Sequence, residues 1–166
     1  MVRNRGSERM NEIKRFSVGF KGEDSFYNSV FKGNELSKKV QNQDLLYKTK
    51  KGYIVIEEKN KECFCAPPFD GHGLNYSQYK RRTDFCKESK MRCLFYVMEK
   101  GKAVCYFQWL DVLARLPKEK QYYSEKSKII IFPLTEFIKC DVDERKKTFE
   151  KIILDYEGEL NGTENK

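Results

Sequence analysis

A chain of 166 residues is long enough for one domain with its own core and too short for two domains of ordinary size. Its 39% hydrophobic and 14% aromatic residues exclude a disordered chain, and the lack of any apolar stretch of membrane-spanning length excludes a transmembrane protein. Lys and Arg outnumber Asp and Glu by 33 to 25, and the net charge of +8 favours a polyanionic partner, nucleic acid before an anionic membrane surface.

The first half of the chain is predicted to form a helix, a β-hairpin and a loop. Aromatic and branched residues at helical spacing predict a short amphipathic helix over residues 23–31. Strands are predicted over 44–48 and 53–59, joined by the turn sequence KTKKG. Residues 60–73 contain two prolines and two glycines, so we expect a flexible loop there, with His72 in it and close to the candidate site.

The second half is predicted to alternate helices and strands. The elements indicated by periodicity are helices over 75–89 and 141–160 and strands over 91–99, 103–110 and 127–134. This order predicts an α/β fold with a central mixed β-sheet flanked by helices. We expect one domain over residues 10–160, with flexible segments at 1–9 and 161–166.

The N-terminus indicates the compartment, and the compartment indicates the state of the cysteines. The N-terminal segment lacks the apolar core of a signal peptide, so we expect a cytoplasmic protein with no membrane partner. Cysteines are then expected to be reduced thiols. A metal site built from Cys63, Cys65 and Cys86 is the alternative, although the one-residue gap in Cys63-Phe64-Cys65 is not the usual zinc spacing.

Charged residues follow the apolar run of the second predicted strand. Side chains on a strand alternate between two faces, so Glu57 and Lys59 share one face and Glu58 points to the other. An antiparallel register would bring Asp44 beside Glu57. Two carboxylates with a lysine make a candidate site for Mg²⁺ or Mn²⁺, because these ions prefer oxygen ligands and lower the pKa of a bound water.

Asp44, followed by Glu57-Glu58-Lys59 after a β-hairpin, resembles the PD-(D/E)XK nuclease superfamily, whose motif is an acid and then Glu-x-Lys on the next strand. The resemblance covers about residues 20–110. It implies a restriction-endonuclease-like αβββαβ core and metal-dependent hydrolysis of DNA phosphodiester bonds. Gln43 stands where the family often has proline, and Arg82 where some branches have tyrosine.

The resemblance also assigns roles to individual residues. Asp44 and Glu57 would hold the metal together with the backbone carbonyl of Glu58, and Lys59 would assist the attacking water. Gln78 on the following helix would position water or phosphate, and Glu23 on the preceding helix would be a further acid. We expect the side chains of Asp44, Glu57 and Lys59 to converge at one edge of the sheet. Because many members of the superfamily are dimers, the resemblance allows a homodimer.

The helix after the hairpin also carries a basic run. Lys80, Arg81 and Arg82 are expected to contact the phosphate backbone of DNA without reading bases. Ordinary alternatives stay open for every residue: Asp44 as a surface carboxylate, Glu57 and Lys59 as a solvated strand end or surface ion pair, and the basic helix as a solvated face. The corresponding alternative function is a non-catalytic nucleic-acid-binding or interaction module that keeps the nuclease-like fold.

Overall fold

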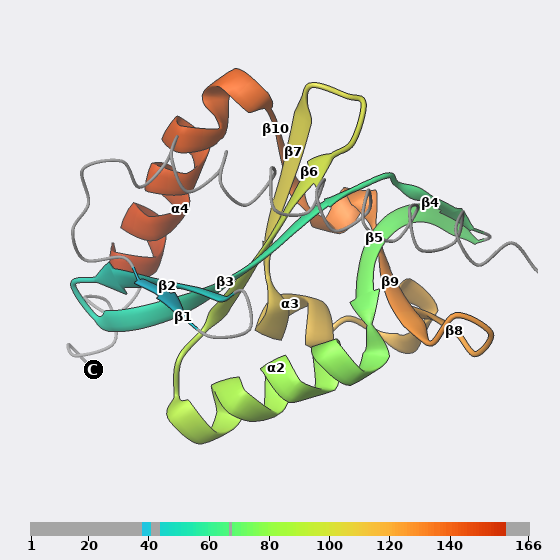
Figure 1. Cartoon of the computed structure of the whole chain (residues 1–166), viewed down its shortest axis with the longest axis horizontal. Helices are drawn as coiled ribbons and strands as arrows, with labels where there is room; N and C mark the ends of the chain where they lie inside the picture. Colours follow the sequence, from blue (N-terminus) through green and yellow to red (C-terminus); the bar gives the residue numbers. More distant parts are fainter. Residues whose placement is uncertain (1–37, 41–43, 67, 159–166) are drawn as a thin grey trace, which may run out of the picture.

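The computed structural model describes residues 38–40, 44–66 and 68–158, which form two β-sheets and three α-helices with short 3₁₀ turns (Figure 1). The strands are β1 (Lys38–Val40), β2 (Asp44–Thr49), β3 (Gly52–Lys61), β4 (Phe64–Ala66), β5 (Phe69–Asn75), β6 (Cys93–Glu99), β7 (Val104–Trp109), β8 (Tyr122–Ser124), β9 (Ile129–Pro133) and β10 (Ile138–Asp141). The helices are α2 (Tyr76–Ser89), α3 (Leu110–Ala114) and α4 (Arg145–Gly158), and the 3₁₀ turns are η2 (Lys118–Lys120), η3 (Leu134–Glu136) and η4 (Val142–Glu144). The helix expected over 23–31 and the terminal segments 1–9 and 161–166 lie outside the described residues.

The larger sheet has six strands in the order β1-β2-β3-β6-β7-β10. Neighbouring strands are antiparallel except β3 and β6, which run parallel and are joined by a crossover containing β4, β5 and α2. A parallel pair needs such a long connection because the chain must return to the same end of the sheet. The prediction of an α/β fold with a mixed sheet is confirmed.

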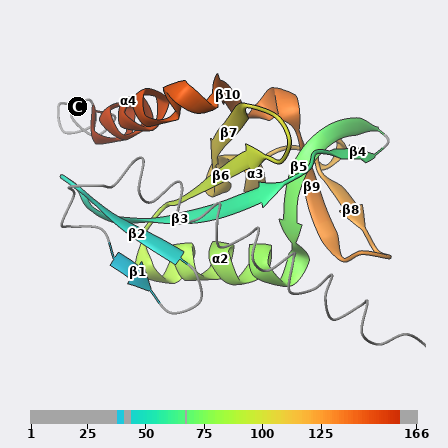
Figure 2. The same ribbon diagram turned by 45° about the horizontal axis from the view of Figure 1, so that its top comes forward.

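Helices cover both faces of this sheet. In Figures 1 and 2, α4 lies on one side of β3 and α2 on the other. One core cluster joins α4 to side chains such as Ile54 and Ile56 of β3 and Tyr96 of β6. The second cluster, on the opposite face, contains Val55 and Phe95. Because apolar side chains are needed on both faces, the middle strands contain unbroken hydrophobic runs, at residues 53–56 of β3 and 93–98 of β6.

Residues 60–73 are not the loop that their prolines and glycines predict. β3 continues to Lys61, and β4 and β5 belong to a second, four-stranded sheet in the order β4-β5-β9-β8. A Cβ built at Gly71 would lie 2.2 Å from the carbonyl oxygen of Phe132, and one at Gly73 would lie 1.9 Å from that of Ile130. These glycines therefore let β5 approach β9 closely. Glycine has this role within strands, where another backbone comes near, and the role differs from the one it has in turns.

Other boundaries differ modestly from the predictions. The last helix begins at Arg145 rather than at residue 141, because the strand β10 and a 3₁₀ turn occupy the preceding residues. The strands β4, β8 and β10 are too short to show a periodicity of their own. Among the helices of the described part, not one combines the length and the apolar character needed to cross a bilayer.

Candidate functional site

Glu57 occupies the middle of β3, and its side chain is only 3% exposed. β3 is flanked by β2 and β6, so Glu57 lies over the centre of the sheet and not at its edge. Glu57 is on the same face as Val55, the face that α2 covers. The interpretation of Glu57 as a solvated strand end is therefore wrong, because the strand continues beyond it and the carboxylate is buried.

The strand register brings Asp44 next to Glu57 along the backbone. Leu45 pairs with Ile56 in the antiparallel ladder of β2 and β3. Asp44 precedes Leu45, and Glu57 follows Ile56. If this register continues by one residue, Asp44 and Glu57 are opposite each other on the two strands. The side chain of Asp44 lies outside the described part of the structure.

Three nitrogen donors surround the carboxylate of Glu57. The amide Nε2 of Gln78 donates to Oε1 at 2.6 Å, and Nε of Arg82 donates to Oε2 at 2.8 Å. The ammonium of Lys59 forms an ion pair with Oε1. Gln78 and Arg82 are four residues apart on α2, so they lie on one face of the helix and reach the same carboxylate.

These contacts determine the charge state of Glu57. Burial alone would raise the pKa of this carboxyl, but the Lys59 ammonium and the Arg82 guanidinium more than offset it and lower the pKa below its ordinary value of 4.5. Lys59 is partly open to solvent, with 26% of its side chain exposed. Glu57 is therefore an ionised, buried carboxylate at neutral pH, next to a cation that a ligand can reach.

Glu58 points away from this cluster, as the alternation of β3 predicts. Its side chain is also buried, at 5% exposure, and it lies on the face packed by α4. The negative charge of Glu58 contributes to raising the pKa of Tyr96, after the larger effects of burial and of Cys105. Two consecutive buried glutamates on opposite faces thus distinguish β3 from an ordinary core strand.

Lys61 extends the polar face of β3, and sequence reasoning missed it because it falls in the segment assigned to a loop. It follows Glu57 and Lys59 at the strand period of two, which was the available signal. Its ammonium donates to the carbonyl oxygen of Gly73 and lies 5.0 Å from the ring centre of Phe64. Burial, aided by the nearby Lys59 charge, lowers the pKa of Lys61 to about 7.

His72 is fully buried in β5 and not in a flexible loop, which corrects the sequence interpretation. Its Nε2 lies 3.6 Å from Oε2 of Glu99, which is longer than an ordinary hydrogen bond, and its ring packs 4.9 Å from that of Tyr106. Burial lowers the pKa of His72 to about 4, so the imidazole is neutral at pH 7. The other oxygen of Glu99 pairs with Lys102 at 2.5 Å.

The basic run on α2 divides into two kinds of residue. Lys80 and Arg81 are exposed, as a phosphate-contacting surface requires. Arg82 instead points inward to Glu57, with 14% of its side chain exposed. Arg82, one of the three residues expected to contact DNA, is thus part of the carboxylate cluster.

The described residues contain no group of three or more His, Cys, Asp or Glu side chains that could hold a metal ion. Cys63 and Cys65 lie beside and within β4, whereas Cys86 lies on α2. All three are free thiols. Glu23 lies outside the described residues, so the structure does not bear on its expected role.

The chemistry available at this site is that of a buried carboxylate with a partly accessible lysine and an amide beside it. Glu57 supplies hard carboxylate oxygens, and Lys59, Gln78 and Arg82 supply donors suited to oxyanions. Comparison with known proteins adds no relative to this picture: no family model matches the chain, and no curated protein is similar to it in sequence.

Proposed function

We propose that this protein is a divalent-cation-dependent nuclease that hydrolyses DNA phosphodiester bonds, with the arrangement of the PD-(D/E)XK superfamily. The observation that carries the proposal is the ionised Glu57, buried at the centre of the sheet with Lys59 on the same face and Gln78 donating to it from the crossover helix. A buried charge is costly, so a chain that keeps one in a central strand is expected to use it.

The topology around Glu57 supports the same proposal. The antiparallel series β1, β2 and β3 leads through β4 and β5 to α2 and then to β6, which runs parallel to β3. With β4 and β5 taken as an insertion, this order is compatible with the part of the superfamily core that follows its first helix. In that order the acid stands at the start of β2 and the Glu-x-Lys sequence on β3. These are the positions of Asp44, Glu57 and Lys59.

The donor set fits a magnesium or manganese ion on one condition. Mg²⁺ is usually held by one or two carboxylates, with water and substrate phosphate completing its shell, so Asp44, Glu57 and the Glu58 carbonyl are a sufficient set. Both oxygens of Glu57 already accept hydrogen bonds from Gln78 and Arg82. Gln78 and Lys59 share Oε1 and Arg82 is on Oε2, so a bound cation has to share the carboxylate with these donors or displace one of them.

Each residue of the cluster then has a defined task. A bound divalent cation supplies a water of lowered pKa and offsets negative charge on the phosphate. Lys59 orients the attacking water or stabilises the charge that develops on the phosphate, because its ammonium is partly accessible and next to Glu57. Gln78 and Arg82, once displaced from Glu57, can donate to phosphate oxygens, for which the planar guanidinium is well suited.

The competing function is a non-catalytic nucleic-acid-binding module. The pairing of Glu57 with Lys59, Gln78 and Arg82 favours it, because such a network also serves as a buried structural ion pair. In that case the exposed Lys80 and Arg81 would bind DNA with no hydrolysis.

Incubation of the full chain with linear, circular and branched DNA, with and without Mg²⁺ or Mn²⁺, separates the two functions. The nuclease proposal expects cleavage that needs the cation and is lost in Lys59→Met, while Lys139→Met, which removes an exposed strand lysine on β10, cleaves normally. Cation-independent binding with no cleavage of any substrate by the wild type would establish the binding module instead.

A further inference from the structure

A second feature lies beside the Glu57 cluster: a pocket of about 550 Å³ between the C-terminal half of α2, the start of β6 and α3. This volume is in the range of small-molecule sites, roughly 300–1,000 Å³. The charged residues in its lining are Lys87, Lys90, Arg92, Asp111 and Arg115. Four of these side chains are cations and one is an anion, so the lining has a positive excess.

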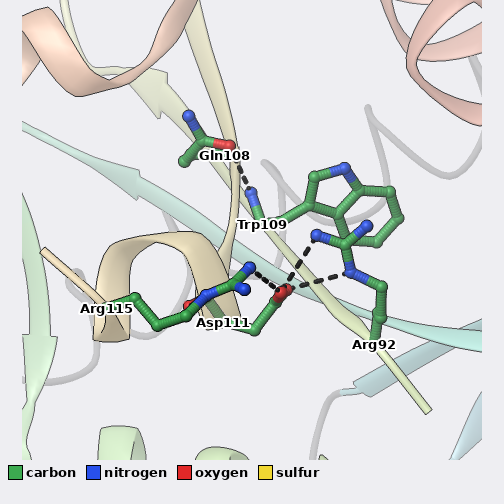
Figure 3. A network of polar contacts seen from close by, with 5 residues as sticks. All are labelled: Arg92, Gln108, Trp109, Asp111 and Arg115. Carbon is green, nitrogen blue, oxygen red and sulfur yellow. Dashed lines mark hydrogen bonds and ion pairs between the residues drawn. The ribbon is translucent and has the colours of Figure 1, made fainter. Parts of the chain in front are cut away.

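The single carboxylate in the lining is already neutralised. Arg92 donates to Asp111 through two nitrogens, at 3.0 and 3.1 Å, and Arg115 donates to Oδ2 at 2.9 Å (Figure 3). Figure 3 also shows Arg92 lying against the indole of Trp109, where the guanidinium is 4.2 Å from the ring centre. Asp111 thus holds both arginines in place at the pocket wall.

Lys87 and Lys90 are the two cations of the pocket lining that do not pair with Asp111. Both are exposed, and neither forms an ion pair with another residue in the described part of the chain. Lysines near a helix C-terminus are favoured by the helix dipole, which accounts for some of their presence. That effect does not require them to border a pocket beside two arginines.

Lys90 is unusual for a second reason. It terminates α2 in the left-handed conformation, with φ of 57°. Glycine and asparagine are the residues that normally take this position, because a Cβ is strained there. The chain therefore keeps a lysine at the pocket rim where a glycine would fit the backbone better.

The floor of the pocket is apolar and continuous with the core. Cys93 and Leu110 are both 1% exposed, and Met91 and Ala114 complete this surface. A ligand that fits both parts has a phosphate for the lysines and a flat, weakly polar body for the floor. A nucleotide has both, and nucleic-acid-binding surfaces combine phosphate contacts with apolar contacts to bases.

The pocket is close to Glu57 on the same side of the sheet. Arg82, which contacts Glu57, adjoins Thr83 of the pocket lining. On β6, Cys93 of the pocket lies two residues before Phe95, which pairs with Glu57. Two strand residues span roughly 7 Å, about the rise of two nucleotides along one strand of duplex DNA.

We propose that this pocket binds a nucleotide of the substrate strand next to the phosphate that the Glu57 cluster cleaves, with Lys87 and Lys90 on its phosphate and the apolar floor under its base. This inference rests on the proposed nuclease function for its substrate. It adds a specificity element: the enzyme holds a nucleotide out of a base stack, which favours single-stranded or locally opened DNA over a closed duplex.

Binding of a fluorescent, 5′-phosphorylated thymidine hexanucleotide tests the pocket in the presence of EDTA, where cleavage plays no part. Lys90→Gly and Lys87→Gln are each expected to weaken binding about three- to tenfold and to reduce its salt dependence, because each removes one phosphate contact. Lys90→Gly should at the same time raise the midpoint of urea denaturation, since glycine relieves the left-handed strain. A weaker-binding but more stable variant excludes misfolding as the cause.

Lys128→Gly is the matched control. Lys128 is also an exposed lysine with a positive φ, of 50°, and it does not line the pocket. Wild-type affinity in Lys90→Gly and Lys87→Gln, an equal loss in Lys128→Gly, or no binding by the wild type would overturn the inference. A wild type that cleaves DNA while the lysine variants bind normally refutes the pocket alone, whereas binding through the pocket with no cleavage refutes the nuclease proposal.

Discussion

Replacing Glu57 with glutamine tests how much the buried carboxylate contributes to stability. An amide keeps the shape of the side chain but carries no charge and only one acceptor oxygen. Arg82 and Gln78 donate to different oxygens at 2.8 and 2.6 Å, so at least one of them then faces an NH₂ group. The Lys59 ammonium and the Arg82 guanidinium also lose their counter-ion.

The size of the effect follows from the burial of these partners. Removing one member of a fully buried ion pair costs about 3–5 kcal/mol. The side chains of Lys59 and Arg82 are 26% and 14% exposed, so water compensates in part. We therefore expect Glu57→Gln to lower the free energy of unfolding at pH 7 by about 2–4 kcal/mol.

The loss should depend on pH in one direction. The pKa of Glu57 is lowered in the folded state, so its contribution is complete above the ordinary value of 4.5 and disappears as the pH falls through the lowered pKa. The difference between wild type and Glu57→Gln should be constant near neutral pH and shrink in acid.

Urea denaturation of both proteins at pH 7 and in acid measures this difference. Glu62→Gln, at an exposed position just after β3, serves as the control and should change stability little. A double-mutant cycle with Arg82→Gln should give a coupling energy of about 1–3 kcal/mol. Wild-type stability in Glu57→Gln, or strict additivity with Arg82→Gln, would refute the reasoning.

Three further predictions follow from the same structure. Gly73→Ala places a Cβ 1.9 Å from the carbonyl oxygen of Ile130 and should lower the free energy of unfolding by about 3 kcal/mol or more. Gly158→Ala is the control, because its Cβ meets no atom within 4 Å. Similar melting temperatures for the two variants would contradict this prediction. The pKa of Lys61 is lowered to about 7 in the folded protein, so above that pH the amine is neutral when the chain is folded and still protonated when it is unfolded. The free energy of unfolding of the wild type should therefore rise by up to about 1.4 kcal/mol per pH unit between about pH 7 and 10. Lys61→Met should abolish this rise in urea denaturation, and an unchanged profile would show that the amine is solvated. Arg81→Ala should reduce the slope of DNA affinity against salt by about one phosphate contact, measured by fluorescence anisotropy, and an unaltered slope would make Arg81 ordinary surface.

Much of the fold was predictable because many elements carry their own local signal. The hairpin of β2 and β3, the helix α2 and the strands β6, β7 and β9 all show an apolar periodicity that needs no knowledge of a partner. The same period of two assigned Glu57 and Lys59 to one face and Glu58 to the other, and the structure has this alternation. Local patterns thus predicted which residues share a face.

The errors occurred where a residue's role depends on a distant strand. Gly71 and Gly73 are typical of a turn when read alone, yet they are strand residues because β9 leaves no room for a Cβ. The same contact buries His72 in β5. For Glu57, the alternative of a solvated strand end stayed open because nothing in the local sequence shows that β3 continues to Lys61 and is covered by α2.

The sequence by itself determined the secondary structure of most of the sheet, the side of β3 on which each charge lies, and the basic character that makes a polyanionic partner the natural expectation. Only the tertiary structure decided that Glu57 is buried, that Gln78 and Arg82 of α2 converge on its carboxylate, and that a pocket with Lys87 and Lys90 at its rim opens beside it. The physical reason is the range of the interactions involved. Side-chain alternation and hydrophobic periodicity act over a few residues, whereas burial, ion pairing and pocket shape depend on segments that the chain brings together only when it folds.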